Sequence, residues 1–482
     1  MRDMVLILAF DADFARTIAR KLRSEHVYCK LAPHDSTLAQ VQQQNPSGII
    51  LAGGVKGRGS VPPTLDARLL EMGLPLLAMG SAARTLCEAM GGLRLQDCLE
   101  KRAAAVAYAD APLFAGVEQG ERWLEHVHQL TLPAGWREMA VADGFVVGFA
   151  HEEKPIFGLQ FQVEKHDPDG MTILSNFARA VCGCTPWWST EAFVERSKAE
   201  IHRRAQAGRV LCAVSGGLDS TVCAVLAHQA VGDRLHCVQV DTGLLRQGEP
   251  QAVRQCLEGL GLSVTQLDMR APVLAALCGV TGLREKAEVV RGLLARTLAE
   301  EAARAGGMDV MLRGINYSDI AFDEEVSQES CGTLQVLEPL REMFRDEVLR
   351  AGEVLALPEQ VLRGQPFPDG GLALRVMGEV TQARLDTLRC ADAIFVEELL
   401  AAGQERKLWK YFATLAQTPE DTRGGQAVVL RAVHRSDVTL SPARLPYDLL
   451  ERVVERILRE VPVVARVLYD MTPALRGQAD WQ

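Results

Sequence analysis

Val210-Leu-Cys-Ala-Val-Ser-Gly-Gly-Leu-Asp-Ser-Thr221 is the stretch that decides the fold of this 482-residue chain. Its first five residues are apolar and partly β-branched, which is typical of a buried strand in a parallel sheet. Ser215, Gly216 and Gly217 follow directly, and apolar residues at helical spacing after Thr221 predict a helix. The sequence therefore predicts a strand, a glycine-rich turn and a helix in immediate succession.

This succession suits a bound phosphate group. Two glycines allow positive φ angles, so successive backbone N–H groups can converge on one oxyanion. Ser220 and Thr221 lie at the expected start of the helix, where the positive end of the helix dipole also favours an anion. An ordinary serine-capped turn can contain Ser-Gly-Gly, but the whole hexapeptide Ser215–Ser220 between strand and helix favours an anion loop. The lysine and spacing of a Walker A loop are absent, which argues against a kinase or GTPase.

Short apolar runs alternate with helical patterns on both sides of the loop. Upstream, we expect strands at Val5–Phe10, Gly48–Ala52, Leu74–Met79, Phe145–Ala150 and Ile156–Phe161, with helices between the early ones, as at Phe14–Ser24. Downstream, we expect strands at Leu235–Val240, Ser263–Leu267 and Met308–Leu312, and helices at Thr190–Ala205, Ser220–Ala230 and Glu285–Ala305. This alternation predicts an α/β protein with two doubly wound, mainly parallel-sheet domains.

Two polar, turn-rich segments mark the expected domain boundaries. Cys184-Thr-Pro-Trp-Trp-Ser189 ends a first domain at residues 1–185, and Gln365-Pro-Phe-Pro-Asp-Gly-Gly371 ends a second at residues 186–364. The third, residues 365–482, is predicted to be small and α+β. Its expected strands are Leu372–Val380 and Ala427–Val433, and its expected helices are Ala391–Ala401 and Tyr447–Glu460.

Bulk composition excludes several function classes. The net charge of −10 and the lack of a long Lys/Arg run argue against nucleic-acid binding. No stretch reaches about 18 apolar residues, so we expect no membrane span. Twelve cysteines are too sparse for a disulfide scaffold and form no zinc-type pairs, so no residue is assigned as a metal ligand. We expect a cytoplasmic protein with reduced thiols.

The anion loop resembles that of the PP-loop ATP pyrophosphatases, which release pyrophosphate while adenylating a substrate oxygen. Asp241-Thr-Gly-Leu-Leu-Arg246, after the next expected strand, extends the likeness. An acidic residue at the end of a strand can reach a ribose hydroxyl or Mg²⁺, although it can also cap a helix in solvent. The expected ATP contacts are Ser215, Gly216, Gly217, Leu218, Asp219, Ser220, Thr221 and Asp241.

The whole chain resembles the GMP synthase family. The supporting stretches include Asn45–Gly54, Val238–Arg246, Leu337–Leu340, Ala391–Glu398, Leu445–Asp448 and Arg466–Asp470. The resemblance implies a class I glutamine amidotransferase domain, a PP-loop domain and a C-terminal dimerisation domain, hence a homodimer. It implies ATP and Mg²⁺ as cofactors, adenylation of the C2 oxygen of XMP, and displacement of AMP by ammonia to give GMP.

The nucleophile expected in the amidotransferase domain is missing. In that family a cysteine thiolate on a sharp strand-to-helix turn attacks glutamine. The matching turn is Pro75–Ala83, and its nucleophile position falls on Gly80. Ser81 is one residue out of phase, and Cys87, about two helical turns onward, is expected to face the core.

The expected base is missing as well. The family's Gln-Phe-His-Pro-Glu segment reads Gln160-Phe-Gln-Val-Glu164, so Gln162 takes the place of the histidine. An amide cannot accept the thiol proton at neutral pH. Only Glu164 remains of the catalytic triad. We therefore expect the glutaminase to be inactive and the ammonia to be supplied free.

Three departures fall where that family holds XMP. Ala287 replaces a phosphate-binding arginine, with Lys286 or Arg284 as the candidate substitute. Ala474 replaces a lysine of the C-terminal tail, with Arg476 as its candidate substitute. Asp319 is a third candidate contact. The lid that follows it is shorter than in the family and more acidic. Each charge-assisted phosphate contact contributes about 1.5–3 kcal/mol, so we expect the loss of two to weaken XMP binding by orders of magnitude.

Three functions therefore remain open at the level of sequence. The chain is a GMP synthase that uses free ammonia, a PP-loop enzyme that adenylates another acceptor, or an ATP-binding scaffold without catalysis. The intact ATP motif favours the first two, whereas the loss of two triad residues is compatible with the third.

Overall fold

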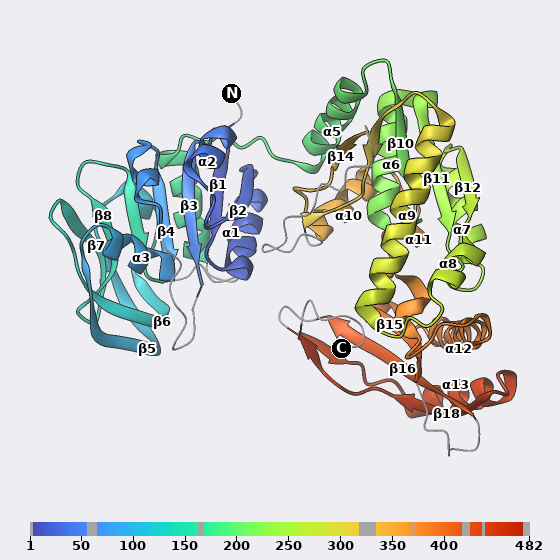
Figure 1. The fold of residues 1–482 in the computed structure, drawn as a ribbon. Coiled ribbons are helices and arrows are strands. Elements are labelled where there is room, and N and C mark those ends of the chain that lie inside the picture. Colours follow the sequence, from blue (N-terminus) through green and yellow to red (C-terminus); the bar gives the residue numbers. More distant parts are fainter. Residues whose placement is uncertain are drawn as a thin grey trace. The chain divides into compact units, whose positions relative to one another are not determined.

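The computed structural model describes residues 3–54, 65–161, 168–317, 334–365, 367–368, 370–416, 425–435 and 439–475. The chain divides into two units, with the described residues up to Phe193 in the first and those from Val194 onward in the second (Figure 1). The expected division into three domains stays a prediction.

The described residues of the first unit form one sheet of nine strands, half of it parallel. The order is β2 (Cys29–Pro33), β1 (Val5–Ala9), β3 (Gly48–Gly53), β4 (Leu76–Gly80), β9 (Ile156–Leu159), β8 (Phe145–His151), β7 (Trp136–Ala142), β5 (Leu93–Tyr108) and β6 (Gly120–Thr131). Pairing is parallel from β2 to β9 and antiparallel from β9 to β6. The helices are α1 (Ala12–Ser24), α2 (Leu38–Gln44), α3 (Ser81–Ala89) and α4 (Pro168–Asn176), with short turns at Ala67–Glu71, Pro112–Phe114 and Phe177–Val181.

Burial explains why the strands of the parallel half were visible in the sequence. Every residue of β1, β3 and β4 is buried, as expected for strands covered by helices on both faces. In β6 only Leu124, Val127 and Leu130 are buried, because much of this strand meets solvent. The five expected strands are confirmed, and the hairpin formed by β5 and β6 is an addition.

The second unit begins within α5 (Thr190–Ala205), at Val194, and contains an all-parallel sheet. Among the described residues its order is β12 (Val264–Asp268), β11 (Leu235–Asp241), β10 (Arg209–Ala213), β13 (Met308–Leu312) and β14 (Gln335–Leu337). The accompanying helices are α6 (Leu218–Val231), α7 (Glu249–Gly259), α8 (Arg270–Ala276), α9 (Leu283–Ala305), α10 (Arg345–Val354) and α11 (Glu359–Leu362), with a short turn at Gly232–Arg234. The expected α/β class is confirmed.

The remainder of the second unit is an α+β layer. Its sheet contains β15 (Lys410–Ala416), β16 (Gln426–Arg435), β17 (Thr439–Pro442), β18 (Val464–Tyr469) and β19 (Ala474–Leu475), and its helices are α12 (Gln382–Ala401) and α13 (Tyr447–Glu460), with short turns at Gly371–Arg375 and Glu405–Lys407. The strand expected at Leu372–Val380 is wrong. Gly371–Arg375 is a 3₁₀ turn, and Val376 makes only an isolated bridge to Leu415.

The carbonyls of that segment explain the difference. Lys286 donates to the carbonyls of Val376 and Gly378, at 2.7 and 2.6 Å. Arg384 donates to the carbonyls of Met377 and Glu379, at 2.7 and 2.5 Å. Lys286, which is distant in sequence, and Arg384, from the helix that follows, thus occupy acceptors that a neighbouring strand would otherwise have used.

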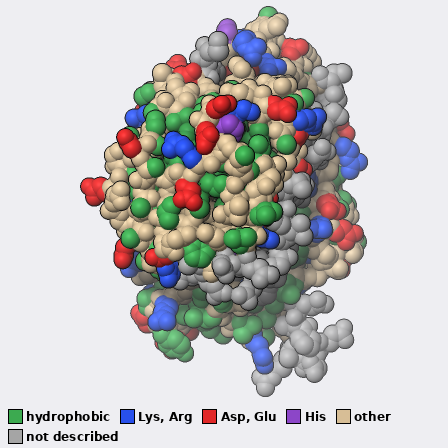
Figure 2. Space-filling model, turned by 90° about the vertical axis from the view of Figure 1, so that its left-hand side faces the viewer, with side chains coloured by type: hydrophobic (Ala, Val, Ile, Leu, Met, Phe, Trp, Pro, Cys, Tyr) green, Lys and Arg blue, Asp and Glu red, His purple; other side chains and the backbone are tan. Residues whose placement is uncertain are grey.

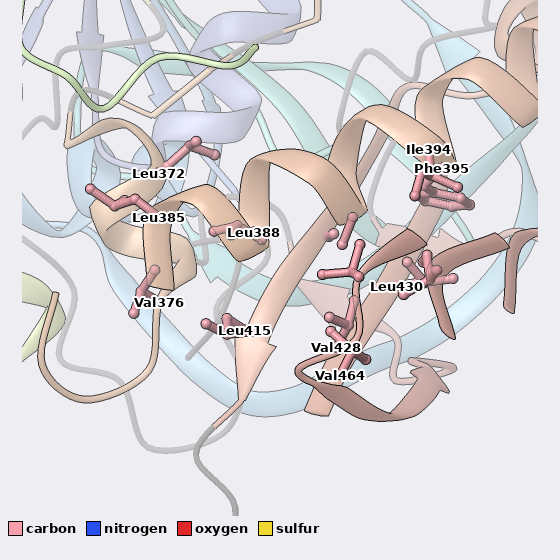
Figure 3. Packing of buried hydrophobic residues seen from close by; sticks show 14 of the residues in the cluster. Leu372, Val376, Leu385, Leu388, Ile394, Phe395, Leu415, Val428, Leu430 and Val464 are labelled. Carbon is pink, nitrogen blue, oxygen red and sulfur yellow. The ribbon is translucent and has the colours of Figure 1, made fainter. Parts of the chain in front are cut away.

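One hydrophobic cluster joins the parallel sheet to the α+β layer within the second unit. Leu244, Val273, Leu277 and Val290 belong to the same cluster as side chains of α12, β15 and β16. Figure 3 shows part of this cluster, including Leu385, Leu388 and Phe395 of α12. The two portions therefore share a core rather than being joined only by a linker.

On the face drawn in Figure 2, acidic and basic side chains are interspersed, and no broad basic area spreads across the coloured residues. Across the described ranges, no helix combines the length and apolar character needed to cross a bilayer. Those cysteines whose positions are described are free thiols.

Candidate functional site

The candidate site lies at the carboxyl edge of the parallel sheet in the second unit. The anion loop follows β10, Asp241 ends the neighbouring strand β11, and the chain after β13 returns beside the loop. Parallel strands bring their carboxyl ends to one edge, which is where α/β proteins hold their ligands. Sequence elements more than 100 residues apart are therefore gathered around one loop.

Gly216 has the backbone conformation that the anion loop requires. Its φ is +82°, and a Cβ built there would lie 2.3 Å from Cγ2 of Val253. A side chain is therefore excluded both by conformation and by space. Gly217 differs, since its φ is −71° and it precedes the first residue of α6.

Hydroxyl groups hold the loop closed. The Ser215 and Ser220 hydroxyls lie 3.0 Å apart, and the backbone N–H of Ser215 donates to Oγ of Ser220 at 3.2 Å. Thr221 donates through Oγ1 to the carbonyl of Gly217 at 2.8 Å. These bonds stabilise the loop conformation from within.

Asp219 lies beside the loop among three groups that sequence reasoning missed. Asn316 donates to its Oδ1 at 3.0 Å, and the Arg345 guanidinium lies 3.4 Å from its Oδ2. A Cβ on Gly314 would lie 2.9 Å from the carbonyl carbon of Asp219, so only glycine lets this chain approach so closely. Arg345 thus places a positive charge beside Asp219, next to a loop that contains no lysine.

The sequence contains a signal for part of this arrangement. Gly314 and Asn316 follow β13 directly, at the same edge at which the anion loop follows β10. Arg345 begins α10 and is 126 residues from Asp219, and no local pattern announces that contact.

We expect Asp219→Asn to increase thermal stability at neutral pH while it reduces ATP turnover. Burial raises the pKa of Asp219, outweighing the opposing effects of Arg345 and Asn316. The folded pKa is thus above the unfolded value of about 4, so the ionised carboxylate lowers stability at neutral pH, and this cost disappears as the pH falls below about 4. Melting temperatures of both proteins at pH 7 and pH 4 provide the test. An equal difference at both pH values would contradict the assignment.

Asp241 has a local partner and remains close to solvent. The N–H of Gly243 donates to its Oδ1 at 2.9 Å, and Nε of Arg270 lies 3.9 Å from its Oδ2. Its side chain is 14% exposed, which leaves part of the carboxylate accessible. The residues that are described contain no cluster of three or more His, Cys, Asp or Glu suited to a metal ion.

In the first unit, Gly80, the position at which the sequence comparison expects a nucleophile, lies at a strand-to-helix turn. Gly80 lies between β4 and α3 with φ 60° and ψ −127°, a conformation that strongly favours glycine. Its neighbour Ser81 is 7% exposed, and its hydroxyl has no hydrogen-bond partner among the described residues. Cys87 is buried, as expected, and burial raises the pKa of its thiol to about 11, which keeps it protonated.

The expected acceptor contacts find little support. Lys286 is completely buried, and its ammonium donates to two backbone carbonyls, so this position gives no support to a phosphate contact. Desolvation lowers the pKa of this lysine to about 8. Asp319, Arg476, Gln162 and Glu164 lie outside the described residues.

Family models match three parts of the chain. Glutamine amidotransferase class-I matches residues 6–181, Queuosine biosynthesis protein QueC matches residues 209–305, and GMP synthase C terminal domain matches residues 397–481. The second match contains the anion loop and Asp241.

Curated relatives match the chain from end to end. The enzymes named GMP synthase [glutamine-hydrolyzing] from Symbiobacterium thermophilum and Thermomicrobium roseum are 35% and 36% identical to it, over 100% of this chain and 99% and 97% of theirs. The first alignment spans 509 positions against 482 residues here, so at least 27 positions of that relative have no counterpart. A solved structure of NMN synthetase from Francisella tularensis is 18% identical over 38% of this chain and 78% of that one, with a TM-score of 0.32, which is too low to carry an argument.

Proposed function

The chain belongs to the GMP synthase family, and on this premise we propose that it converts XMP to GMP with ATP and free ammonia. The C2 oxygen of XMP attacks the α-phosphate of ATP, and pyrophosphate leaves. Ammonia then attacks C2, and AMP leaves with the oxygen. Glutamine is not a nitrogen donor in this proposal.

The anion loop, held by its own hydroxyl groups, is the observation that carries the proposal. Gly216 has the positive φ that a tight glycine turn of this kind requires, and the hydroxyls of Ser215 and Ser220 hold that conformation. Such a loop binds the phosphates that become pyrophosphate, without reorganisation when the bond breaks. Arg345 lies close enough to add a charge-assisted contact to the leaving group.

Mg²⁺ fits this site as a companion of ATP. Magnesium sites in nucleotide enzymes use one or two carboxylates together with substrate phosphates, and do not need a cage made by protein alone. Asp241 and Asp219 are the carboxylates that would complete its coordination, Asp241 being the less engaged of the two. When bound, the ion neutralises phosphate charge as pyrophosphate forms.

The turn at Gly80 supports the use of free ammonia. Its backbone retains an elbow that would present a nucleophile, but glycine has no side chain to attack glutamine. The nearest hydroxyl and thiol, on Ser81 and Cys87, are buried. The first unit then keeps the shape of an amidotransferase without its chemistry.

The direct test mixes the protein with ATP, Mg²⁺, XMP and ammonium and measures AMP, pyrophosphate and GMP. We expect all three products in equal amounts. Pyrophosphate release that requires another acceptor would favour the second candidate function, which the buried position of Lys286 supports. ATP binding without turnover on any acceptor would leave a scaffold and overturn the proposal.

We further propose that the chain is a homodimer through its α+β layer. Apolar side chains are exposed on and beside α13 and β18, namely Tyr447 (76%), Leu458 (43%), Val463 (51%), Leu468 (51%) and Met471 (55%). Large apolar side chains that are exposed in a monomer are typical of a protein–protein interface when they lie on one surface. A second copy of the same surface would cover them.

Leu468→Asp is expected to convert the dimer to a monomer, because a carboxylate would be buried unpaired in the interface. Light scattering after size exclusion measures the mass. Leu93→Asp is the matched control, since Leu93 is 63% exposed on β5 of the first unit. A monomeric wild-type protein, or equal masses for the wild type and Leu468→Asp, would refute the proposed interface.

A further inference from the structure

The loop that follows Asp241 is held by the C-terminal α+β layer. Its backbone carbonyls at Gly243, Leu244 and Leu245 all have partners from that layer. Arg389 of α12 donates to Gly243 through NH2 and to Leu245 through Nε, the latter at 3.1 Å. The N–H of Leu372 donates to the carbonyl of Leu244 at 2.8 Å. A loop of the nucleotide-binding sheet therefore depends on residues from beyond position 370.

Arg389 is suited to this contact by its shape. Its guanidinium presents several donors in one rigid plane, so it can hold two carbonyls of the same turn together. Its third contact, through NH1 to Oδ1 of Asp386 at 2.7 Å, steadies the side chain from its own helix. The side chain is 17% exposed, so water competes little for these bonds.

The end of the same loop is anchored by one of its own side chains, Arg246, which contacts residues of the α+β layer. The Nε of Arg246 lies 3.1 Å from Oδ2 of Asp392, and its NH2 donates to the carbonyl of Tyr411 at 3.3 Å. Asp392 is 3% exposed, and its Oδ1 accepts a bond from the N–H of Ala413 at 2.8 Å. Both ends of the loop are thus fixed to one rigid body.

We propose that Arg389 is a positioning residue for ATP, acting through Gly243 on Asp241. The N–H of Gly243 donates to Oδ1 of Asp241, so a shift of Gly243 shifts the carboxylate. Gly243 itself has φ of +69°, which glycine adopts without strain, so contacts with neighbouring residues, and not the local backbone alone, must select this conformation. This inference rests on the proposed ATP site and adds that the C-terminal layer sets its geometry.

Arg384 provides a matched control on the same helix. It also donates to two backbone carbonyls, but these belong to Met377 and Glu379, outside the Asp241 loop. Removing either arginine frees two carbonyls and leaves a similar void. Only the Arg389 substitution should change the affinity for the nucleotide.

The experiment measures the Kd of a non-hydrolysable ATP analogue with Mg²⁺ by calorimetry, and KM for ATP and for ammonium. We expect Arg389→Ala to weaken analogue binding and raise KM for ATP about 10-fold or more, with KM for ammonium unchanged. Arg389→Lys should recover part of the loss, because a lysine reaches one carbonyl. Arg384→Ala should bind the analogue as the wild type does.

Each alternative result has a distinct meaning. If Arg389→Ala is unfolded, Arg389→Gln and Arg389→Lys carry the test, and wild-type affinity in both would overturn the inference. Equal weakening by Arg384→Ala would also overturn it, because the effect would then be general destabilisation. A wild-type protein that does not bind the analogue would overturn the proposed function and this inference together.

Discussion

Gly216→Ala is expected to lower kcat/KM for ATP by about 100-fold or more, since two charge-assisted contacts of about 1.5–3 kcal/mol each depend on this turn. The new methyl group would lie 2.3 Å from Cγ2 of Val253, and the φ of +82° disfavours any side chain. The loop must then move, and the N–H groups no longer point to one phosphate. Initial rates of pyrophosphate release over a range of ATP concentrations give the result.

Gly261→Ala separates this local effect from backbone strain in general. Gly261 also has positive φ, at +78°, but a methyl group added there would have Nε2 of His228 as its nearest neighbour, 4.0 Å away. We expect a small loss of stability, of about 1 kcal/mol, and wild-type kinetics. Similar kinetic losses in both variants, or wild-type turnover in Gly216→Ala, would contradict the role given to the loop.

The parts of the fold that could be predicted are those whose causes are local. The β10 strand, the anion loop and α6 follow from one run of residues, in which apolar character, glycine and helical spacing succeed each other. The α13 helix begins and ends at the predicted residues because its apolar stripe is regular. The completely buried strands of the first unit were equally plain, since they read as continuous apolar runs.

The remainder depends on partners distant in sequence. Leu372–Val380 has the composition of a strand, but Lys286, 90 residues before Val376, takes up two of its carbonyls. Arg384, at the start of the next helix, takes up two more. The same burial removes Lys286 from the solvent in which a phosphate would meet it. Arg345 reaches Asp219, and Arg389 reaches the Asp241 loop, only because helices α10 and α12 pack where they do. Composition and spacing along the chain contain no signal for such contacts.

Glutamine is expected to support GMP formation at least about 1,000-fold more slowly than ammonium, because loss of a catalytic triad member costs several orders of magnitude. Gly80 supplies no thiolate, and Gln162 cannot accept a proton. Release of glutamate from glutamine, measured with and without ATP and XMP, tests the hydrolysis itself. Rates with ammonium at the same pH supply the reference, and comparable rates with the two donors would refute the loss of the glutaminase.

Placing a cysteine at position 80 and a histidine at position 162 tests whether these two positions account for the expected loss of glutaminase activity. Gly80 retains φ 60° and ψ −127°, so a cysteine placed there would stand on an elbow that is already formed. Gly80→Cys alone should remain inactive, because no base removes the thiol proton. Gly80→Cys with Gln162→His should restore measurable glutamate release, with Glu164 left to orient the new histidine. If the double variant is folded but inactive, losses beyond the triad have removed glutamine binding; if the single variant is active, the requirement for a base at residue 162 is wrong.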